Sequence, residues 1–406
     1  MALPALALGA LLVTASAPAV KYKASARIES VVRTPLVTET AATRVVSDVM
    51  IAPRLDSVLY TSRMELKFVY EPQFWMRQVA LQQTFESLQS VFTQLEYSLR
   101  RDFKLLAVHT TTFGSFPLND FGGAARTSLP VSPPKEGNGS SAYIYTETAL
   151  GFVGSFGIKR LNVAGTLGWV VNGLLDPPVR PTRRGNASYP QQRYPELRMQ
   201  SFYGATRRDY FTLYLYGRDV SFSTGNRDAM IQFAPGLQHQ FNNLVDLSVD
   251  PGVALGRIYP RRPDQPIRTF RMPTLDMALN TPVPVGLHWP VKAKVRLRYL
   301  PYIDPLTTQL IPRGETGVEF KWEGRREAKV LGKVFYSHAL TSGPHRYDND
   351  VRLEAESFLP LPHTRFLVLQ TKGQFRWTHH VVLPPEATVQ WALSVGLVVR
   401  YDRGRL

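Results

Sequence analysis

The chain has 406 residues and a formal net charge of +16, because 48 lysine and arginine residues stand against 32 aspartate and glutamate residues. Hydrophobic residues make up 44% of it, which excludes an intrinsically disordered chain, and 31 prolines and 28 glycines disfavour a long helical bundle. It contains no cysteine, so disulfides, thiolate metal sites and cysteine nucleophiles are excluded. The excess of positive charge indicates an anionic partner, which is nucleic acid, anionic lipid or an acidic polymer.

The amino terminus has the pattern of a secretory signal peptide. Residues 1–19 have no charged side chain and include an apolar run from Leu3 to Val13, after which Ala17-Pro18-Ala19 supplies the small residues of a cleavage site. We therefore predict a signal peptide over residues 1–19. The basic residues from Lys21 to Arg27 follow the apolar run instead of preceding it, so an uncleaved membrane anchor is the alternative.

No other stretch of the chain approaches the roughly 18 apolar residues that a membrane-spanning helix needs. A protein of this composition that crosses a membrane must therefore do so as a closed barrel of strands. We predict an N-terminal periplasmic segment over residues 20–43 and a transmembrane β-barrel over residues 44–406.

Residues 81–99 give two conflicting signals. Apolar residues recur there at intervals of four and three, from Leu81 to Leu99, which is typical of a helix. However, Leu95, Tyr97 and Leu99 also alternate with polar residues, and residues 64–71 alternate before them. We predict strands here, with an inward-folded plug helix as the alternative.

Apolar and polar residues alternate in several later segments, notably 161–171, 318–323, 367–377 and 387–402. The last of these runs for sixteen residues, with Trp391 and Tyr401 in its apolar row, whereas strands of soluble proteins usually have about 5–6 residues. A long alternating strand with aromatic residues towards its ends is typical of a membrane barrel.

Turn signals separate the alternating segments. The short sequences Arg100-Arg101-Asp102, Arg207-Arg208-Asp209 and Arg325-Arg326-Glu327 each lie between two of them, while residues 117–140 and 176–195 form long connections rich in Pro, Gly and Ser. Short turns that alternate with long loops match the two ends of an outer-membrane barrel. We predict an all-β fold: a transmembrane antiparallel up-and-down β-barrel of about 16–18 strands, which encloses water.

The residues with the clearest functional pattern are cations in the last third of the chain. Between residues 291 and 299 one face of the predicted strand is apolar and the other carries Lys292, Lys294, Arg296 and Arg298. Neighbouring strands add further cations, so the predicted pore-lining set is Lys292, Lys294, Arg296, Arg298, Lys329, Lys333, Lys372, Arg376 and Arg400. A basic wall of this kind attracts anions.

Carboxylates in the same region, Glu319, Glu323, Glu354 and Glu356, are expected to pair with some of these cations. The alternative interpretation of the row is an internal ladder of salt bridges that only stiffens the barrel.

Histidines give no clear site. His379-His380 are adjacent, so on a strand their side chains point to opposite faces, and His109, His239 and His338 have no nucleophile partner in the sequence. We therefore predict no catalytic residues, no metal and no cofactor.

The export signal, the alternating strands and the long terminal strand resemble a bacterial outer-membrane β-barrel, although the chain ends Tyr401-Asp402-Arg403-Gly404-Arg405-Leu406 and not on the aromatic residue usual in that class. Within that class the segments Ile51-Ala52-Pro53-Arg54-Leu55, Glu71-Pro72-Gln73-Phe74 and Ala234-Pro235-Gly236-Leu237 are similar to those of exopolysaccharide-export porins. This resemblance implies passage of an acidic polymer alongside a periplasmic export protein.

We expect a bacterial outer-membrane pore, not an enzyme, that translocates anionic solutes or an acidic polysaccharide. Its partners would be outer-membrane lipid and the polymer, without nucleic acid. Two alternatives remain open: an outer-membrane barrel hydrolase with a narrow or plugged lumen, and a secreted β-rich protein that binds anionic glycans.

Overall fold

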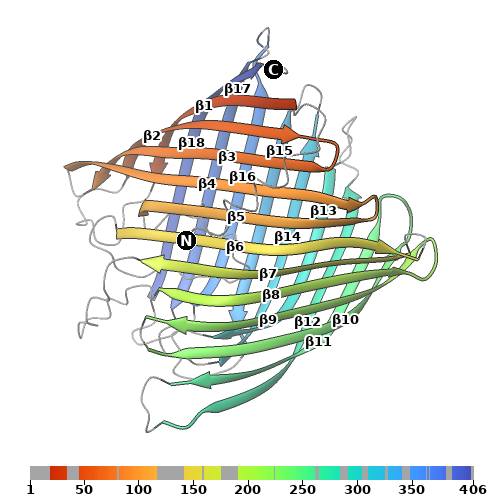
Figure 1. The fold of residues 1–406 in the computed structure, drawn as a ribbon. Coiled ribbons are helices and arrows are strands. Elements are labelled where there is room, and N and C mark those ends of the chain that lie inside the picture. Colours follow the sequence, from red (N-terminus) through yellow and green to blue (C-terminus); the bar gives the residue numbers. More distant parts are fainter. Residues whose placement is uncertain are drawn as a thin grey trace, which may run out of the picture.

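Eighteen antiparallel strands form one sheet that closes on itself (Figure 1). The computed structural model describes residues 19–33, 45–79, 82–116, 141–157, 160–174, 191–223, 225–260, 265–283, 291–303, 310–324, 328–340, 348–362, 364, 366–380 and 386–403. Each strand pairs with the next in sequence, and β1 pairs with both β2 and β18. The fold is therefore the predicted up-and-down barrel, at the upper end of the predicted strand number.

The first nine strands form the near wall in Figure 1: β1 Ala19–Arg33, β2 Val46–Tyr60, β3 Met64–Val79, β4 Gln82–Arg100, β5 Phe103–Phe116, β6 Ser141–Phe156, β7 Leu161–Leu174, β8 Gln192–Gly204 and β9 Asp209–Phe222. The other nine complete the ring: β10 Arg227–Gln240, β11 Asp246–Tyr259, β12 Arg268–Val283, β13 Val291–Ile303, β14 Leu310–Glu323, β15 Lys329–Ala339, β16 Asp348–Pro360, β17 Leu367–His380 and β18 Glu386–Arg403. Among the described residues no helix is long and apolar enough to cross a membrane.

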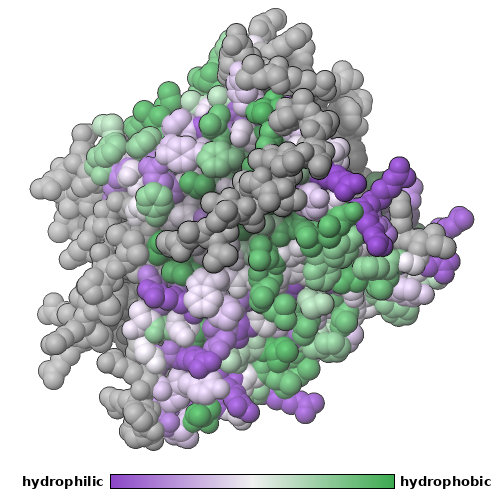
Figure 2. Space-filling view, in the orientation of Figure 1, coloured by the Kyte–Doolittle hydropathy of each residue, from purple (hydrophilic) through white to green (hydrophobic). Residues whose placement is uncertain are grey.

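The two faces of the wall differ in chemistry, as the alternation predicts. Large apolar side chains are exposed on the outer face, for example Leu150 (66%), Leu393 (59%) and Ile28 (53%). Figure 2 shows hydrophobic side chains over much of the outer wall, with hydrophilic ones at the strand ends on the right. Only a closed barrel or helices can span a bilayer, and a closed barrel with an apolar outer face is the outer-membrane form. The protein belongs in the bacterial outer membrane.

The two ends of the barrel carry different connections. The first four connections that follow even-numbered strands are the short turns 61–63, 101–102, 157–160 and 205–208, and the start of β1 and the end of β18 lie at the same end. The opposite end carries the connections 117–140 and 175–191. Because outer-membrane barrels have short periplasmic turns and long extracellular loops, the end with the short turns is the periplasmic one.

Prolines explain three interruptions in the pairing. The hydrogen-bonded register between β2 and β3 skips the residues around Pro53 and Pro72, and that between β10 and β11 skips those around Pro235 and Pro251. Pairing between β8 and β9 breaks at Pro195. Proline has no backbone N–H to donate to the sheet, so each interruption is local and the register resumes unchanged beyond it.

The sequence predictions for the individual segments have different outcomes. Residues 82–100 form β4, so the strand prediction was right and the plug helix is absent from this segment. Residues 19–33 form β1, within the range that we assigned to a periplasmic segment, so that boundary was wrong and the wall begins earlier. Residues 1–18 and the turn at 325–327 lie outside the described residues, and the signal peptide stays a prediction.

Candidate functional site on the inner wall

The row of cations on β13 lies on the inner face of the barrel. Val295 and Leu297 are 38% and 44% exposed on the outer face, and Lys294, Arg296 and Arg298 alternate with them. The strand therefore places its charged side chains toward the lumen because its apolar side chains face lipid.

The two arginines of β13 share one carboxylate of β12. Arg296 donates to both oxygens of Asp276, from Nε to Oδ1 at 3.0 Å and from Nη2 to Oδ2 at 2.6 Å. Arg298 donates from Nε to Oδ2 of the same residue at 3.1 Å, and its Nη1 lies 3.9 Å from Glu315 Oε2. These contacts fix both guanidinium groups against the wall and neutralise much of their charge.

Arginines nearer the extracellular end are paired and buried in the same way. Arg376 Nε donates to Asp350 Oδ1 at 2.7 Å, and Arg352 donates to the other oxygen of that carboxylate. Arg33 Nε donates to Asp48 Oδ2 at 2.6 Å on the β1–β2 wall. Further buried ion pairs of this half, among the described residues, include Arg218 with Asp228 and Arg313 with Glu315, and Arg313 also donates to Ser337.

Lysines at the periplasmic end have a different environment. Lys333 lies 4.0 Å from Glu354, and its side chain is 47% exposed. Lys292 is exposed, and Lys294, Lys329 and Lys372 are half-buried. Within the described residues none of these last four has a carboxylate oxygen within 4.0 Å of its amino group. Glu319, Glu323 and Glu356 stand opposite Lys294, Lys329 and Lys372 on the neighbouring strands without forming such an ion pair.

The change from lysine to arginine occurs along individual strands. On β13, Lys292 and Lys294 lie nearer the periplasmic end than Arg296 and Arg298, and on β17 Lys372 precedes Arg376 in the same sense. On β14, which runs in the opposite direction, Arg313 is near the extracellular end. Codon bias acts on the overall ratio of arginine to lysine and does not order the two along a strand.

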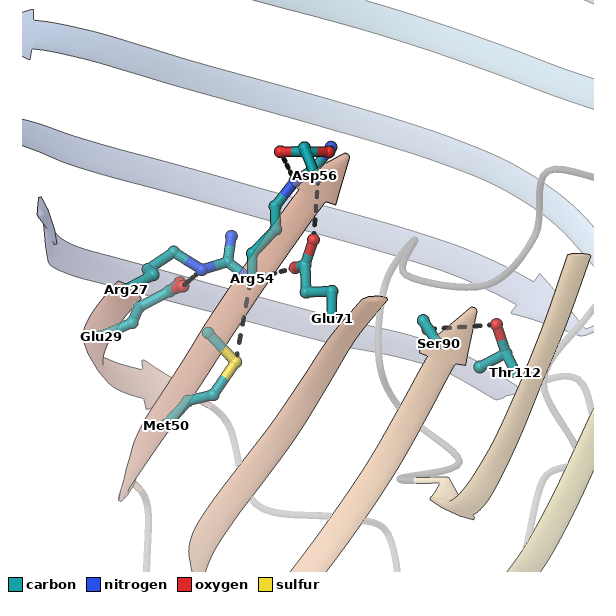
Figure 3. Close-up of polar contacts among 8 residues, drawn as sticks. All are labelled: Arg27, Glu29, Met50, Arg54, Asp56, Glu71, Ser90 and Thr112. Carbon is teal, nitrogen blue, oxygen red and sulfur yellow. Dashed lines mark hydrogen bonds and ion pairs between the residues drawn. The ribbon is translucent and has the colours of Figure 1, made fainter. Parts of the chain in front are cut away.

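Figure 3 shows that the wall formed by β1 to β3 also carries a charge cluster, of two arginines and three carboxylates. Arg54 Nη1 donates to Glu71 Oε2 at 2.9 Å, and its Nε and Nη2 donate to Asp56, each at 2.9 Å. Arg27 lies 3.6 Å from both Glu29 and Glu71. These cations have carboxylate partners, so this side of the lumen differs from the lysine positions of β13, β15 and β17.

A cavity of about 400 Å³ adjoins the β13 row on the inner side of strands β8 to β13. Its wall includes Gln200, Tyr214, Asp276, Lys294 and Arg298. The rings of Tyr214 and Tyr216 stack beside it, with centroids 6.3 Å apart. An aromatic face next to amide, carboxylate and cationic groups suits a polar ring compound such as a sugar, which offers both C–H faces and hydroxyls.

Of the four carboxylates expected to pair with the predicted cations, Glu354 does so, with Lys333 at 4.0 Å. Glu323 pairs instead with Lys321 at 2.6 Å, and Glu356 accepts a hydrogen bond from Gln370 at 2.7 Å. Glu319 has no ion pair within 4.0 Å among the described residues. The carboxylates that neutralise the arginines, Asp276, Glu315 and Asp350, were missed. Arg400 lies on the inner face of β18 near its periplasmic end.

The histidines are spread over the barrel. His109 bonds to threonines on the outer wall, and His239 Nδ1 lies 2.7 Å from Asp209 Oδ1 at a periplasmic turn. His338 stacks on Tyr336, also on the outer face, while the side chains of His379 and His380 lie outside the described residues. No group of three or more metal-ligating side chains occurs in the part of the chain that the structure describes.

Comparison with known proteins gives one family. The sequence pattern of the EpsX exopolysaccharide export family matches residues 11–404. No curated protein matches the chain.

Among solved structures, OpdK of Pseudomonas aeruginosa is similar with a TM-score of 0.49 at 10% identity, over 94% of this chain and 99% of that one. OccK2 (OpdF) of the same organism, in complex with glucuronate, has a TM-score of 0.48 at 11% identity, over 94% and 98%. A bacterial polysaccharide outer membrane secretin has a TM-score of 0.35 at 10% identity, over 93% and 98%.

Proposed function

The chain belongs to the EpsX exopolysaccharide export family, and on that premise we propose that its barrel conducts an acidic polysaccharide across the outer membrane, from a lysine-lined periplasmic mouth outward. A barrel of eighteen strands is wide enough to enclose an aqueous path.

The observation that carries the proposal is the difference in ion pairing between the arginines and the lysines of the inner face. The arginines of the extracellular half are held by carboxylates, whereas among the described residues no carboxylate oxygen lies within 4.0 Å of the amino groups of Lys292, Lys294, Lys329 and Lys372. An ammonium group on a flexible stem binds anions as a mobile point charge, so it can attract successive carboxylates of a moving polymer without fixing any of them.

The cavity beside β13 supports the same substrate class. Lys294 would face the carboxylate of an acidic sugar unit, while Tyr214 offers a ring face and Gln200 an amide for its hydroxyls. Passage of a polymer requires that each sugar unit binds weakly enough to leave again. A cavity in the wall that is open to the lumen meets that requirement.

A periplasmic export protein is the expected partner. The periplasmic turns carry exposed arginines, including Arg63, Arg101 and Arg208, so the surface that meets it is positively charged. A partner with an acidic rim would be steered to this end of the barrel.

We propose no catalytic role. The pair His239–Asp209 lies at a periplasmic turn with Thr206 and Phe241 as its neighbours, away from the lumen cavity.

The test is conductance in a planar bilayer with a salt gradient, followed by addition of polygalacturonate oligomers or neutral dextran to the periplasmic side. We expect anion selectivity, and block by the acidic oligomer at lower concentration than by dextran. The combined variant Lys292→Gln, Lys294→Gln, Lys329→Gln and Lys372→Gln should lose the anion selectivity and the preferential block by the acidic oligomer. As a control of equal charge change, Arg63→Gln, Arg101→Gln, Arg207→Gln and Arg208→Gln at the turns should retain the selectivity. Unchanged selectivity in the lysine variant would refute the proposal.

A further inference from the structure

The outer wall of β4, β5 and β6 carries a polar island near the middle of these strands. The island consists of Thr93 on β4, His109 and Thr111 on β5, and Thr146 and Thr148 on β6. Thr93 pairs with His109 and His109 with Thr148 across the sheet, while Thr111 pairs with Thr146. The five side chains therefore form one contiguous patch over three neighbouring strands.

The island faces the membrane and not the lumen. His109 and Thr111 alternate along β5 in the same register as Leu105 and Phe113, which are 41% and 46% exposed. Thr148 is itself exposed, two residues from Leu150. Apolar residues of the outer face thus flank the island toward both ends of the strands. The island therefore lies within the band of apolar outer side chains that faces the lipid.

Hydrogen bonds link most of the island internally. His109 Nδ1 lies 2.9 Å from Thr148 Oγ1, and His109 Nε2 lies 2.8 Å from Thr111 Oγ1, which in turn lies 3.1 Å from Thr146 Oγ1. A hydroxyl has one donor and two acceptor positions, so these bonds leave further acceptor positions on the threonines. The island has an ordered geometry and spare capacity to hydrogen-bond outward.

Lipid cannot use that capacity. Acyl chains neither donate nor accept hydrogen bonds, so polar side chains within the band are unfavourable against lipid and mark places where protein packs on protein.

We propose that the polar island is the contact between two copies of this chain, related by a two-fold axis along the membrane normal. Barrels inserted in the same direction present the island at the same depth, so a second copy always brings a matching patch, whereas another partner would need its own polar group at that depth. Hydroxyl and imidazole groups can both donate and accept hydrogen bonds, which makes the island complementary to itself. The proposal is independent of what the barrel conducts.

The absence of cysteine makes the test direct, since a single introduced cysteine is the only thiol. Thr148→Cys lies at the exposed edge of the island, and Leu297→Cys lies on the outer wall of β13, 44% exposed, as the matched control. After oxidation in outer membranes we expect a covalent dimer from Thr148→Cys and none from Leu297→Cys. Equal yields from both, no dimer from Thr148→Cys, or a cross-link to a different protein would overturn the proposal.

A second variant removes only the hydroxyls. Thr93→Val, Thr111→Val and Thr146→Val together keep the side-chain shape and increase β-propensity, so the barrel should still fold, which heat-modifiable migration on a gel verifies. Introduced beside Thr148→Cys, these changes should lower the yield of covalent dimer several-fold. A folded barrel that cross-links as before would show that the hydroxyls do not make the contact.

Discussion

Arg296 on β13 is held by Asp276 on β12 through two hydrogen bonds, of 3.0 Å and 2.6 Å. Lys294, on the same face two residues earlier, has no carboxylate at comparable distance among the described residues. The inner face of β13 thus combines an arginine held in an ion pair with a lysine that has no carboxylate oxygen within 4.0 Å in the described part of the chain. In the proposed pore, the charge that a solute encounters would depend on these pairings more than on the number of basic residues.

Asp276→Asn should increase the anion selectivity of the pore. The substitution removes the negative charge that Arg296 and Arg298 share, while the amide oxygen can still accept a hydrogen bond, so two guanidinium groups become available to solute. We expect the anion-to-cation permeability ratio, read from the reversal potential, to rise about twofold or more. Asp219→Asn, at the exposed pair that Asp219 forms with Arg227 on the outer wall, is the control of equal charge change and should have a smaller effect. A ratio that stays constant in Asp276→Asn would mean that ions pass elsewhere in the lumen.

The fold was largely predictable because apolar and polar residues alternate along a strand whose two faces contact lipid and the lumen. The sixteen-residue run at 387–402 lies within β18, and the row at 291–299 lies within β13. The prediction was less certain where apolar residues occur on both faces of a strand. In β4 apolar residues occupy both faces, with Leu88 inside and Phe85 and Leu99 outside, which is why the spacing imitated a helix.

The arginine partners were not predictable in the same way. Asp276 stands alone in a mostly apolar segment, and Asp350 follows a connection whose length hides the register of β16. Which carboxylate meets which guanidinium depends on the cross-strand register, and a shift of one residue would move each to the other face. The sequence contains the charges, but their pairing is a property of the closed sheet.

Asp350→Ala should destabilise the barrel. Asp350 is 2% exposed and accepts hydrogen bonds from Arg376 and Arg352, so its removal leaves buried guanidinium charge without this partner. We expect the free energy of unfolding, measured by denaturant titration in vesicles, to fall by about 3 kcal/mol. Glu323→Ala removes the partner of Lys321 in an exposed pair and should produce no measurable change. Equal losses in the two variants would contradict the distinction between a buried and a solvated charge network.

Anion selectivity should weaken as salt is raised. In the proposed pore the four lysines would act on ions through the water of the lumen, and the Debye length falls from about 10 Å at 0.1 M to about 3 Å at 1 M ionic strength. We expect the wild-type permeability ratio to approach that of the variant lacking the four lysines when both are measured at high salt. Selectivity that persists unchanged at high salt would instead assign discrimination to a tight constriction with direct contacts.

The orientation of the barrel can be tested with single cysteines, again because the chain has none of its own. Ser223→Cys lies in the exposed turn between β9 and β10, at the end that carries the long connections, and Arg208→Cys lies in the exposed turn between β8 and β9. In intact cells a large membrane-impermeant maleimide should label Ser223→Cys and leave Arg208→Cys unlabelled until the outer membrane is permeabilised. The opposite pattern would invert the barrel, and the lysines near the start of β13 would then line the extracellular mouth, where they could not receive a polymer arriving from the periplasm.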